Sequence, residues 1–413
     1  QMGRSERDWP LASRYGALKA RFRPVLDRIA QGAVQREVTR RLPHEEIGWL
    51  KQAGFGALRV PVEHGGSGAT IPDLFRLLID LAEADSNIAQ SLRGHFAFVE
   101  DILARPEAVA KPWFARFAAG EIVGNAWSEV GDVKLGERKV QLVSQGADFA
   151  LEGVKYYSTG AIFAEWIDVL ATRSTDGAAV IAAVDTRQPS VQRSDDWTGF
   201  GQRTTGSGTT TFATAPVAAA HVFAFETRFP YQTAFYQTVL NAVLAGSAAA
   251  AVRETSAFLK ARKRVYSSGT APVAAQDPQL LQVIGRAHAF AEAARAATLA
   301  GAEAVQTAYE ARFLNDEAAD RAANVEAELA SARAQSVAAD LALRATSDIF
   351  NALSASATDT GLALDRHWRN ARTAANHNPL IFKERILGDH LVNGTEPPFL
   401  WQIGTPDLPK TER

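Results

Sequence analysis

The sequence predicts an α+β fold in which two helical domains, residues 1–120 and 229–413, flank a β-domain at residues 121–228. Two changes in composition along the 413 residues indicate this order. Apolar residues first recur at helical spacing, then stand in short Val-, Ile- and Thr-rich runs between turn residues, and finally lie within long alanine-rich stretches. A chain of this length can bury a large core across several packed layers.

The N-terminal domain is predicted to be helical from Trp9 to about Gly120. Its apolar side chains recur every three or four residues, which is the period of a buried helix face, as in Leu18, Phe22, Val25, Leu26 and Ile29. A turn-rich loop at 61–68 (PVEHGGSG) interrupts the pattern. A second helical face then follows, at Leu77, Leu78, Leu81 and Ala82.

The middle domain is predicted to consist of short strands. Runs rich in β-branched and aromatic residues predict strands at 140–143, 149–154, 167–172, 180–184 and 209–214. Gly, Asp, Ser and Pro separate these runs, and the Ser-Thr-Asp-Gly sequence at 174–177 is typical of a hairpin turn. We therefore expect a small antiparallel sandwich or barrel.

The C-terminal domain is predicted to be a four-helix bundle. Alanine dominates after Tyr231, and alanine has the highest intrinsic helix propensity. Three or four long helices fit between Tyr231 and Ala357, with an interruption near 267–272. One buried face is predicted at Leu280, Ile284, Ala287 and Ala291.

Composition excludes several functions. The formal net charge of −2 gives no basic excess for nucleic acid, and we expect no membrane span because no apolar run has the necessary length. The absence of cysteine excludes disulfides and thiolate metal ligands, and no His or carboxylate cluster has metal-ligand spacing, so no metal is predicted. Neither a G-x-G-x-x-G fingerprint after a strand nor a G-x-S-x-G elbow is present. This composition fits a cytoplasmic enzyme.

Four segments and the end of the chain carry a family resemblance. The segments are 60–68 (VPVEHGGSG), 124–129 (GNAWSE), 153–160 (GVKYYSTG) and 201–208 (GQRTTGSG). In their order and spacing they resemble motifs of the acyl-CoA dehydrogenase superfamily, whose members end in E-R-x-x-R-D-A-R followed by a catalytic glutamate. Here Arg366, Arg369 and Arg372 keep the first half of that ending, but His377 and Asn378 stand at the Tyr-Glu pair. The sequence thus resembles the scaffold of the superfamily, but it lacks the glutamate that serves as the catalytic base.

Three details favour the flavin-dependent monooxygenase branch of this superfamily, which includes dibenzothiophene monooxygenases and sulfur-acquisition oxidoreductases. They are the segment 94–98 (GHFAF), the Tyr-Ser-Thr-Gly form of 157–160, and His377-Asn-Pro. This resemblance implies a two-component enzyme that receives FMNH2 from a separate NAD(P)H:flavin reductase. It would form a flavin peroxide with O2 and oxygenate a small sulfur- or nitrogen-containing substrate. An acyl-CoA dehydrogenase or oxidase with FAD and another base, and a non-catalytic flavin-binding protein, stay open as alternatives.

The resemblance also implies catalytic residues. Ser158 is expected to be the partner of flavin N5, since a hydroxyl both donates and accepts. His377 is expected to handle protons at the peroxide, because imidazole titrates near neutrality. His95 and Asn125 are the predicted supporting polar pair. His377 and Asn125 also have ordinary structural interpretations, as a satisfied structural histidine on a helix and as a residue that caps a strand or turn.

The predicted cofactor contacts are Asn125, Trp127, Ser128, Ser158, Arg264, Ser356 and His377. FMN is favoured over FAD because the stretch 354–358 (SASAT) lacks the Gly-Gly-x-Gly-Tyr turn that the family places against the adenosine half of FAD. Arg262 or Arg264 is expected to hold the phosphate, with Arg264 preferred. The resemblance and the apolar helices together predict a homotetramer.

Overall fold

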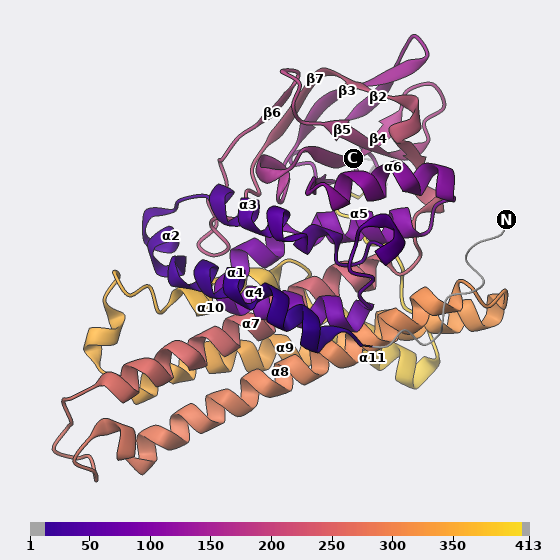
Figure 1. The fold of residues 1–413 in the computed structure, drawn as a ribbon. Coiled ribbons are helices and arrows are strands. Elements are labelled where there is room, and N and C mark those ends of the chain that lie inside the picture. Colours follow the sequence, from indigo (N-terminus) through magenta and orange to yellow (C-terminus); the bar gives the residue numbers. More distant parts are fainter. Residues whose placement is uncertain (1–12, 407–413) are drawn as a thin grey trace, which may run out of the picture.

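The structure is a computed structural model that describes residues 13–406. Figure 1 shows three layers: the sheet at one end, the N-terminal helices in the middle, and the long C-terminal helices on the other side. The α+β fold class predicted from the sequence is confirmed. Trp9, where the helical pattern was predicted to begin, lies outside the described residues, and the first described helix begins at Tyr15.

Helices of the N-terminal part follow the predicted periodicity. In the first one, Leu18, Phe22, Leu26 and Ile29 are buried. The fourth, the longest of them, is buried over most of its surface and packs against the C-terminal helices. The six helices are α1 (Tyr15–Gln31), α2 (Ala33–Thr39), α3 (His44–Ala53), α4 (Ile71–Ser91), α5 (Arg93–Leu103) and α6 (Glu107–Ala118).

The middle part forms one mixed sheet in the order β6-β7-β3-β2-β4-β5-β8, with β1 beside β4. All five predicted runs are strands, whereas three strands of three or four residues are too short to give a pattern. The strands are β1 (Val123–Ala126), β2 (Gln141–Gln145), β3 (Asp148–Lys155), β4 (Trp166–Arg173), β5 (Ala179–Asp185), β6 (Val191–Arg193), β7 (Thr210–Val217) and β8 (Val222–Ala224).

The sequence predicted an antiparallel sheet, and this was wrong in part, because two of the strand pairs are parallel. β4 pairs in parallel with β1 along its first half and with β2 at its end. Parallel neighbours need a long connection rather than a hairpin, and the chain between β1 and β4 supplies it by forming β2 and β3. As a consequence β1, which comes directly from the helical part, is inserted into the sheet at the edge of β4.

Three long helices dominate the C-terminal part: α7 (Gln232–Ala261), α8 (Pro278–Ala311) and α9 (Glu317–Asp348). The short α10 (Arg366–Asn376) packs against α7 and α9, and α11 (Leu380–Asn393) packs against α9. The four-helix bundle stays a prediction. In the predicted face of α8, Ala287 and Ala291 are buried, while Leu280 and Ile284 are half-buried.

The two helical parts share one hydrophobic core. Phe75 of α4 and Phe235 of α7, for example, lie 5.3 Å apart between ring centres. By length and hydropathy alone α7 could cross a membrane, but 89% of its most apolar window is buried inside the protein, which is the pattern of a core helix. The predicted domain boundaries at 120 and 228 stay predictions; the first falls between α6 and β1, and the second between β8 and α7.

Candidate functional site

Ser158 lies in a tight turn after β3. Tyr157 adopts a left-handed φ of 60°, and Gly160 has a φ of 75°. A Cβ on Gly160 would lie 2.1 Å from the carbonyl oxygen of Ser91, so only glycine lets the turn approach the end of α4 this closely. The Ser158 side chain is buried, 1% exposed, and its Oγ has no hydrogen-bond partner within residues 13–406. Buried hydroxyls are normally paired, so this Oγ keeps its capacity to bond a ligand, as do a few other buried hydroxyls such as that of Thr210.

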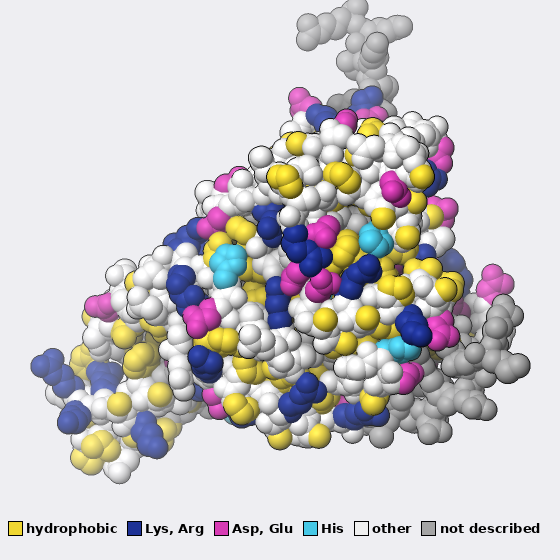
Figure 2. Space-filling view, turned by 45° about the horizontal axis from the view of Figure 1, so that its top comes forward, with side chains coloured by type: hydrophobic (Ala, Val, Ile, Leu, Met, Phe, Trp, Pro, Cys, Tyr) yellow, Lys and Arg dark blue, Asp and Glu magenta, His cyan; other side chains and the backbone are white. Residues whose placement is uncertain are grey.

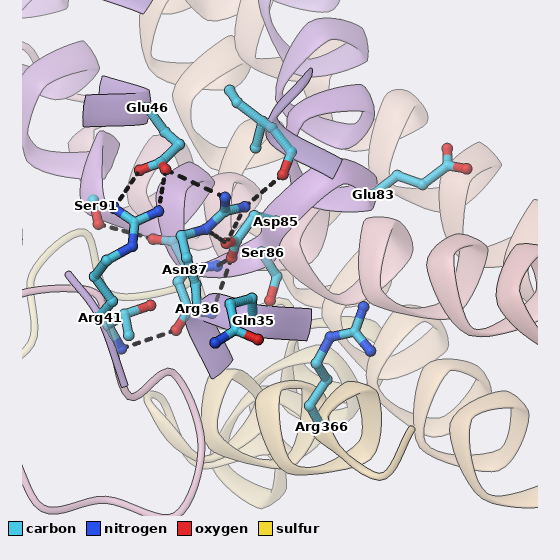
Figure 3. Close-up of polar contacts among 12 residues, drawn as sticks. Gln35, Arg36, Arg41, Glu46, Glu83, Asp85, Ser86, Asn87, Ser91 and Arg366 are labelled. Carbon is cyan, nitrogen blue, oxygen red and sulfur yellow. Dashed lines mark hydrogen bonds and ion pairs between the residues drawn. The ribbon is translucent and has the colours of Figure 1, made fainter. Parts of the chain in front are cut away.

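The helix α4, whose end contacts the Ser158 turn, is broken at Asp85. Asp85 leaves helical geometry, with φ −160° and ψ 108°, and its Oδ1 accepts from the backbone N–H of Asn87. Figure 3 shows Arg36 pointing toward Asp85 and Glu46, while Arg41 reaches the same glutamate from the other side. The Arg36 Nη2–Asp85 Oδ2 distance is 3.0 Å. Two buried acids and one buried arginine thus fix the position of the break.

The segment of α4 beyond the break holds the loop 201–208, which matched a family motif. The Asn87 Oδ1 accepts from the backbone N–H of Thr204 at 3.1 Å, and Ser91 Oγ donates to the Thr205 carbonyl at 3.3 Å. The Thr205 carbonyl also accepts from the N–H of Gly160 at 3.0 Å. The broken helix, the loop and the Ser158 turn therefore form one connected support.

Asn125 and Trp127 meet at a buried carboxylate. The backbone N–H of Asn125 in β1 donates to the Thr159 carbonyl at 3.1 Å, which places Asn125 beside the Ser158 turn. Asn125 Nδ2 and Trp127 Nε1 both donate to Asp168 Oδ1, at 3.0 and 3.1 Å. Burial raises the pKa of Asp168 to about 6. Ser128, predicted beside them, is exposed, and its carbonyl accepts from the backbone N–H of Tyr156.

His377 follows the C-terminus of α10 and is accessible to solvent. Its Nε2 lies 3.0 Å from Nη2 of Arg93 in α5. A guanidinium can only donate, so Nε2 accepts and the ring proton lies on Nδ1. The surrounding protein, and then the charge of Arg93, lower the pKa of His377 well below its usual range, so the ring is neutral at pH 7. His377 is thus a neutral imidazole beside a fixed cation, and not an imidazolium acid.

His95 has a structural position. It is 0% exposed, its Nε2 donates to the Gly56 carbonyl at 2.8 Å, and its Nδ1 accepts from the N–H of Val123 at 3.1 Å. Because both ring nitrogens are bonded to backbone, neither is available to a substrate or cofactor. His95 instead ties β1, the strand that carries Asn125, to the helical part. The geometry therefore gives it a positioning role and does not support the predicted catalytic one.

Arg264 and Ser356 lie away from the Ser158 turn. Arg264 stands in the α7–α8 connection at the end of the bundle remote from the sheet (Figure 1). Figure 2 shows Lys and Arg side chains gathered at this narrow end; the sequence there includes Lys260, Arg262, Lys263 and Arg264. Arg262 Nε donates to the Arg264 carbonyl at 3.1 Å, and the Arg264 side chain is exposed. Ser356 is exposed in the connection between α9 and α10. One copy of the chain thus does not bring these two residues to Ser158.

Three charged or phenolic residues at this site were missed by sequence reasoning. Arg93 and Arg228 are buried beside the half-buried Tyr236: both guanidinium carbons lie within 6 Å of the centre of the Tyr236 ring, at 5.3 and 5.9 Å. Arg228 Nη2 also donates to the tyrosine hydroxyl at 2.8 Å. No motif marks them, although Arg93 directly precedes the Gly94 segment. A buried arginine and a surface arginine look the same in one sequence.

Comparisons with known proteins agree with this architecture. Residues 238–381 match the family described as acyl-CoA dehydrogenase, C-terminal domain. A dibenzothiophene monooxygenase of Paenibacillus sp. A11-2, solved with FMN and indole, superposes with a TM-score of 0.84 at 24% identity, covering 93% of this chain and 98% of that one. This protein has the acyl-CoA dehydrogenase fold. The resemblance predicted from the motifs is confirmed.

Other known proteins match over similar lengths. Methanesulfinate monooxygenase of Pseudomonas fluorescens superposes with a TM-score of 0.83 at 24% identity, covering 94% of this chain and 99% of that one. By sequence, a probable FMNH2-dependent monooxygenase of Pseudomonas putida is 28% identical over 391 residues, 91% of this chain and 94% of the relative. A dibenzothiophene monooxygenase of Mycolicibacterium goodii is 26% identical over 369 residues, 86% and 88% of the two lengths.

Proposed function

We propose that the protein is a two-component monooxygenase that uses FMNH2 and O2 to oxygenate a small organic compound containing sulfur or nitrogen. A separate NAD(P)H:flavin reductase would supply the reduced flavin. The names of the matched relatives support this reading, since they include FMNH2-dependent and sulfur-compound monooxygenases. The observation that carries the proposal is the buried, unpartnered Oγ of Ser158.

The residues present fit a flavin. The Oγ of Ser158 can donate to or accept from a ring nitrogen and so can follow its redox state. Asn125 and Trp127 stand beside the same turn and would form the polar and aromatic wall of the ring site. When bound, FMNH2 supplies the two electrons that let O2 give one oxygen atom to the substrate and one to water. FMN, rather than FAD, is the cofactor named in the matched FMN complex and in the Pseudomonas putida relative.

The pair His377–Arg93 would act on the oxygen that is transferred. Arg93 fixes the imidazole through its Nε2, so the ring's donor is the Nδ1–H, and the Asn378 side chain also interacts with the ring. A neutral imidazole can donate a hydrogen bond from Nδ1 without losing its proton. The guanidinium next to it would stabilise negative charge that develops on the departing oxygen, because a buried, fixed cation needs no reorganisation. His377 thus orients the oxygen, and Arg93 supplies the charge.

The motif resemblance puts Asn378 at the position of a dehydrogenase's base, and its side chain bonds further amides on α7. Asn378 Nδ2 donates to Gln237 Oε1 at 2.7 Å, and Gln237 Nε2 donates to Asn241 Oδ1 at 2.9 Å. Amide oxygens are too weakly basic to remove a proton from carbon. These amides, two on α7 and one in the connection after α10, favour oxygen transfer over dehydrogenation.

Isotope labelling tests the proposal. The protein is incubated with FMN, NADH, a flavin reductase and ¹⁸O2, together with a panel of sulfides, sulfinates and amines, and products are analysed by mass spectrometry. We expect one ¹⁸O atom in a product and less H2O2 than in the sample without substrate. Release of all consumed O2 as H2O2 with every compound would contradict oxygenation. Anaerobic bleaching of bound flavin by an acyl-CoA would establish a dehydrogenase instead.

A homotetramer would complete the cofactor site. Arg264 and Ser356 are exposed and remote from Ser158 in their own chain, so a neighbouring copy would have to supply the phosphate contacts. Mixing Ser158→Ala subunits with Arg264→Ala subunits tests this, because a site shared between copies is restored in some hybrids. Recovery of activity that neither parent has is the expected result. No recovery, or a monomer by light scattering, would contradict it. The cytoplasmic location stays a prediction.

A further inference from the structure

Asn125 is held in place by three contacts. Its backbone N–H donates to the Thr159 carbonyl at 3.1 Å, beside the Ser158 turn. A Cβ on Gly94 of α5 would lie 2.5 Å from the Asn125 Cβ, so the helix and β1 can approach this closely only because residue 94 is glycine. The third contact is that of the amide nitrogen, which donates to Asp168 Oδ1 at 3.0 Å. The fold thus fixes the backbone and Cβ of Asn125, and Asp168 fixes its amide.

The carboxylate of Asp168 decides which end of this amide faces it. Asp168 in β4 and Asn125 in β1 are paired in the parallel register, so their side chains lie next to each other. An ionised carboxylate can only accept hydrogen bonds, and the two ends of an amide have nearly the same shape. The nitrogen of Asn125 therefore faces Asp168, and the oxygen faces away. Within residues 13–406 this oxygen accepts no hydrogen bond, and Asn125 is 8% exposed. The Asn125 Oδ1 is consequently an acceptor that a ligand can use.

Trp127 is bound to the same carboxylate oxygen. Its Nε1, which can only donate, lies 3.1 Å from Asp168 Oδ1. The indole ring meets the rings of Phe225 and Tyr236 edge-on, at 5.7 and 5.6 Å between ring centres. One oxygen atom of Asp168 thus orients both of the side chains that are proposed to line the flavin ring site.

Arg228 helps to keep this buried carboxylate ionised. Asp168 is 0% exposed, and burial raises its pKa to about 6, while the charge of Arg228 acts in the opposite direction. The Arg228 Nη2 lies 3.5 Å from Asp168 Oδ2, and this oxygen accepts no hydrogen bond in the described part of the chain, so charge alone joins the pair. At pH 7 the carboxyl group is therefore ionised, and below about pH 6 it takes up a proton.

Three further ionisable groups lie around Asp168. Arg93 of α5 interacts with the carboxylate electrostatically and keeps its own charge, because burial lowers its pKa only to about 10. Tyr236 of α7 stays neutral, since burial raises the pKa of its hydroxyl. Asp101 of α5 repels the carboxylate and is itself paired with Arg105 at 2.9 Å. Of the groups with a shifted pKa in this cluster, Asp168 is the one that changes charge near pH 6.

We propose that Asp168 is a positioning residue of the flavin site: as a carboxylate it presents the Asn125 oxygen as a hydrogen-bond acceptor, and as a neutral acid it releases the amide to turn. A protonated carboxyl group can also donate, so either end of the amide can then face it. Reduced flavin carries N–H donors that oxidised flavin lacks, so a fixed acceptor at the ring favours the reduced form. The inference rests on the proposed function and deepens it, because Asp168, through Asn125, makes the site prefer FMNH2 to FMN.

A double-mutant cycle tests whether Asp168 acts through Asn125. Asp168→Asn keeps the shape of the side chain and removes its charge, and Asn125→Ala removes the acceptor. The Kd values of reduced and oxidised FMN are measured by anaerobic titration of the wild type, both single variants and the double variant. The control is Asp73→Asn, because Asp73 is an equally buried acid that lies in α4 and is paired with Arg76.

We expect the wild-type protein to bind reduced FMN more tightly than oxidised FMN. Each single variant should lower this preference roughly two- to tenfold, the effect of one hydrogen bond. In the Asn125→Ala background, Asp168→Asn should change the preference no further, because the acceptor that Asp168 orients is gone. Asp73→Asn should leave the preference unchanged. Effects of the two substitutions that add in the double variant, or an unchanged preference in Asp168→Asn, would overturn the proposal.

A second measurement needs neither flavin nor a substitution of Asp168. The emission of Trp127 in the flavin-free protein is obtained as the difference between the wild type and Trp127→Phe. It should change with a midpoint near pH 6, because the hydrogen bond from Trp127 changes when Asp168 takes up a proton. Emission that stays constant through this pH range would also overturn the proposal. Failure of the proposed function is distinguishable, because a protein that binds no FMN would still show this titration.

Discussion

Replacing Ser158 with alanine should affect the flavin-free and the flavin-bound protein in opposite directions. A buried polar atom without a partner costs about 1–3 kcal/mol, and in the flavin-free protein the Ser158 Oγ is such an atom. Ser158→Ala should therefore leave the free energy of unfolding unchanged or raise it by up to about 1–3 kcal/mol. With FMN present the variant loses one hydrogen bond, worth about 0.5–1.5 kcal/mol, so the Kd of FMN should rise roughly two- to tenfold.

A second buried serine close by provides the control. The Ser207 Oγ lies 2.8 Å from Thr159 Oγ1 and 2.6 Å from Thr205 Oγ1, so Ser207→Ala removes satisfied contacts and should destabilise the flavin-free protein by about 1–3 kcal/mol. Urea unfolding with and without saturating FMN, and fluorescence titration of FMN, measure these effects. If Ser158→Ala destabilises the flavin-free protein as much as Ser207→Ala does, the hydroxyl has a protein partner and the reasoning is refuted.

Three further predictions concern single residues. His377→Ala should lower oxygenation by about 10²–10⁴-fold while FMN binding is nearly kept, so the ratio of product to H2O2 should collapse; an unchanged ratio would remove His377 from the reaction. Arg59→Met leaves Glu100 buried without its ion-pair partner and should cost about 3–5 kcal/mol in urea unfolding, much of it recovered in the double variant with Glu100→Leu. Asp168 has a pKa raised to about 6 from an ordinary value near 4, so between these pH values the native protein holds a proton that the unfolded chain has lost. Its contribution to stability should therefore fall as the pH rises from about 4 to about 6, and Asp168→Asn should flatten that slope in pH-dependent unfolding.

The sequence predicts local structure well where one face of an element is buried. The stripe that begins at Leu18 and Phe22 and the five longer strands were found because burial of one side imposes a period. Strand pairing is different, because it depends on residues far apart in the chain. The insertion of β1 beside β4 leaves no trace in the sequence of β1, whose four residues are all buried.

The choice between Arg93 and His95 shows a second limit. Successive residues of a helix are turned by about 100°, so these two side chains point about 200° apart and cannot both face one site. A polar side could reveal which one does, but every residue of α5 is buried. The motif indicated this segment, but the structure places Arg93, and not His95, beside His377. The turn and its motif determine the buried orientation of Ser158, and its role stays a prediction.

The break at Asp85 has a consequence for the motions of the protein. A continuous α4 would open as one cooperative unit, from the bundle to the support of the Ser158 turn. Because the segment after Asp85 has its own N-terminal hydrogen bond, it can open by itself. Amide hydrogen exchange should therefore show two rates along this helix: slow exchange in 74–84, which packs against α7, and an independent rate in 88–91. Flavin binding should slow the second group and leave the first unchanged, so that the cofactor site can loosen and close while the core beneath it stays folded.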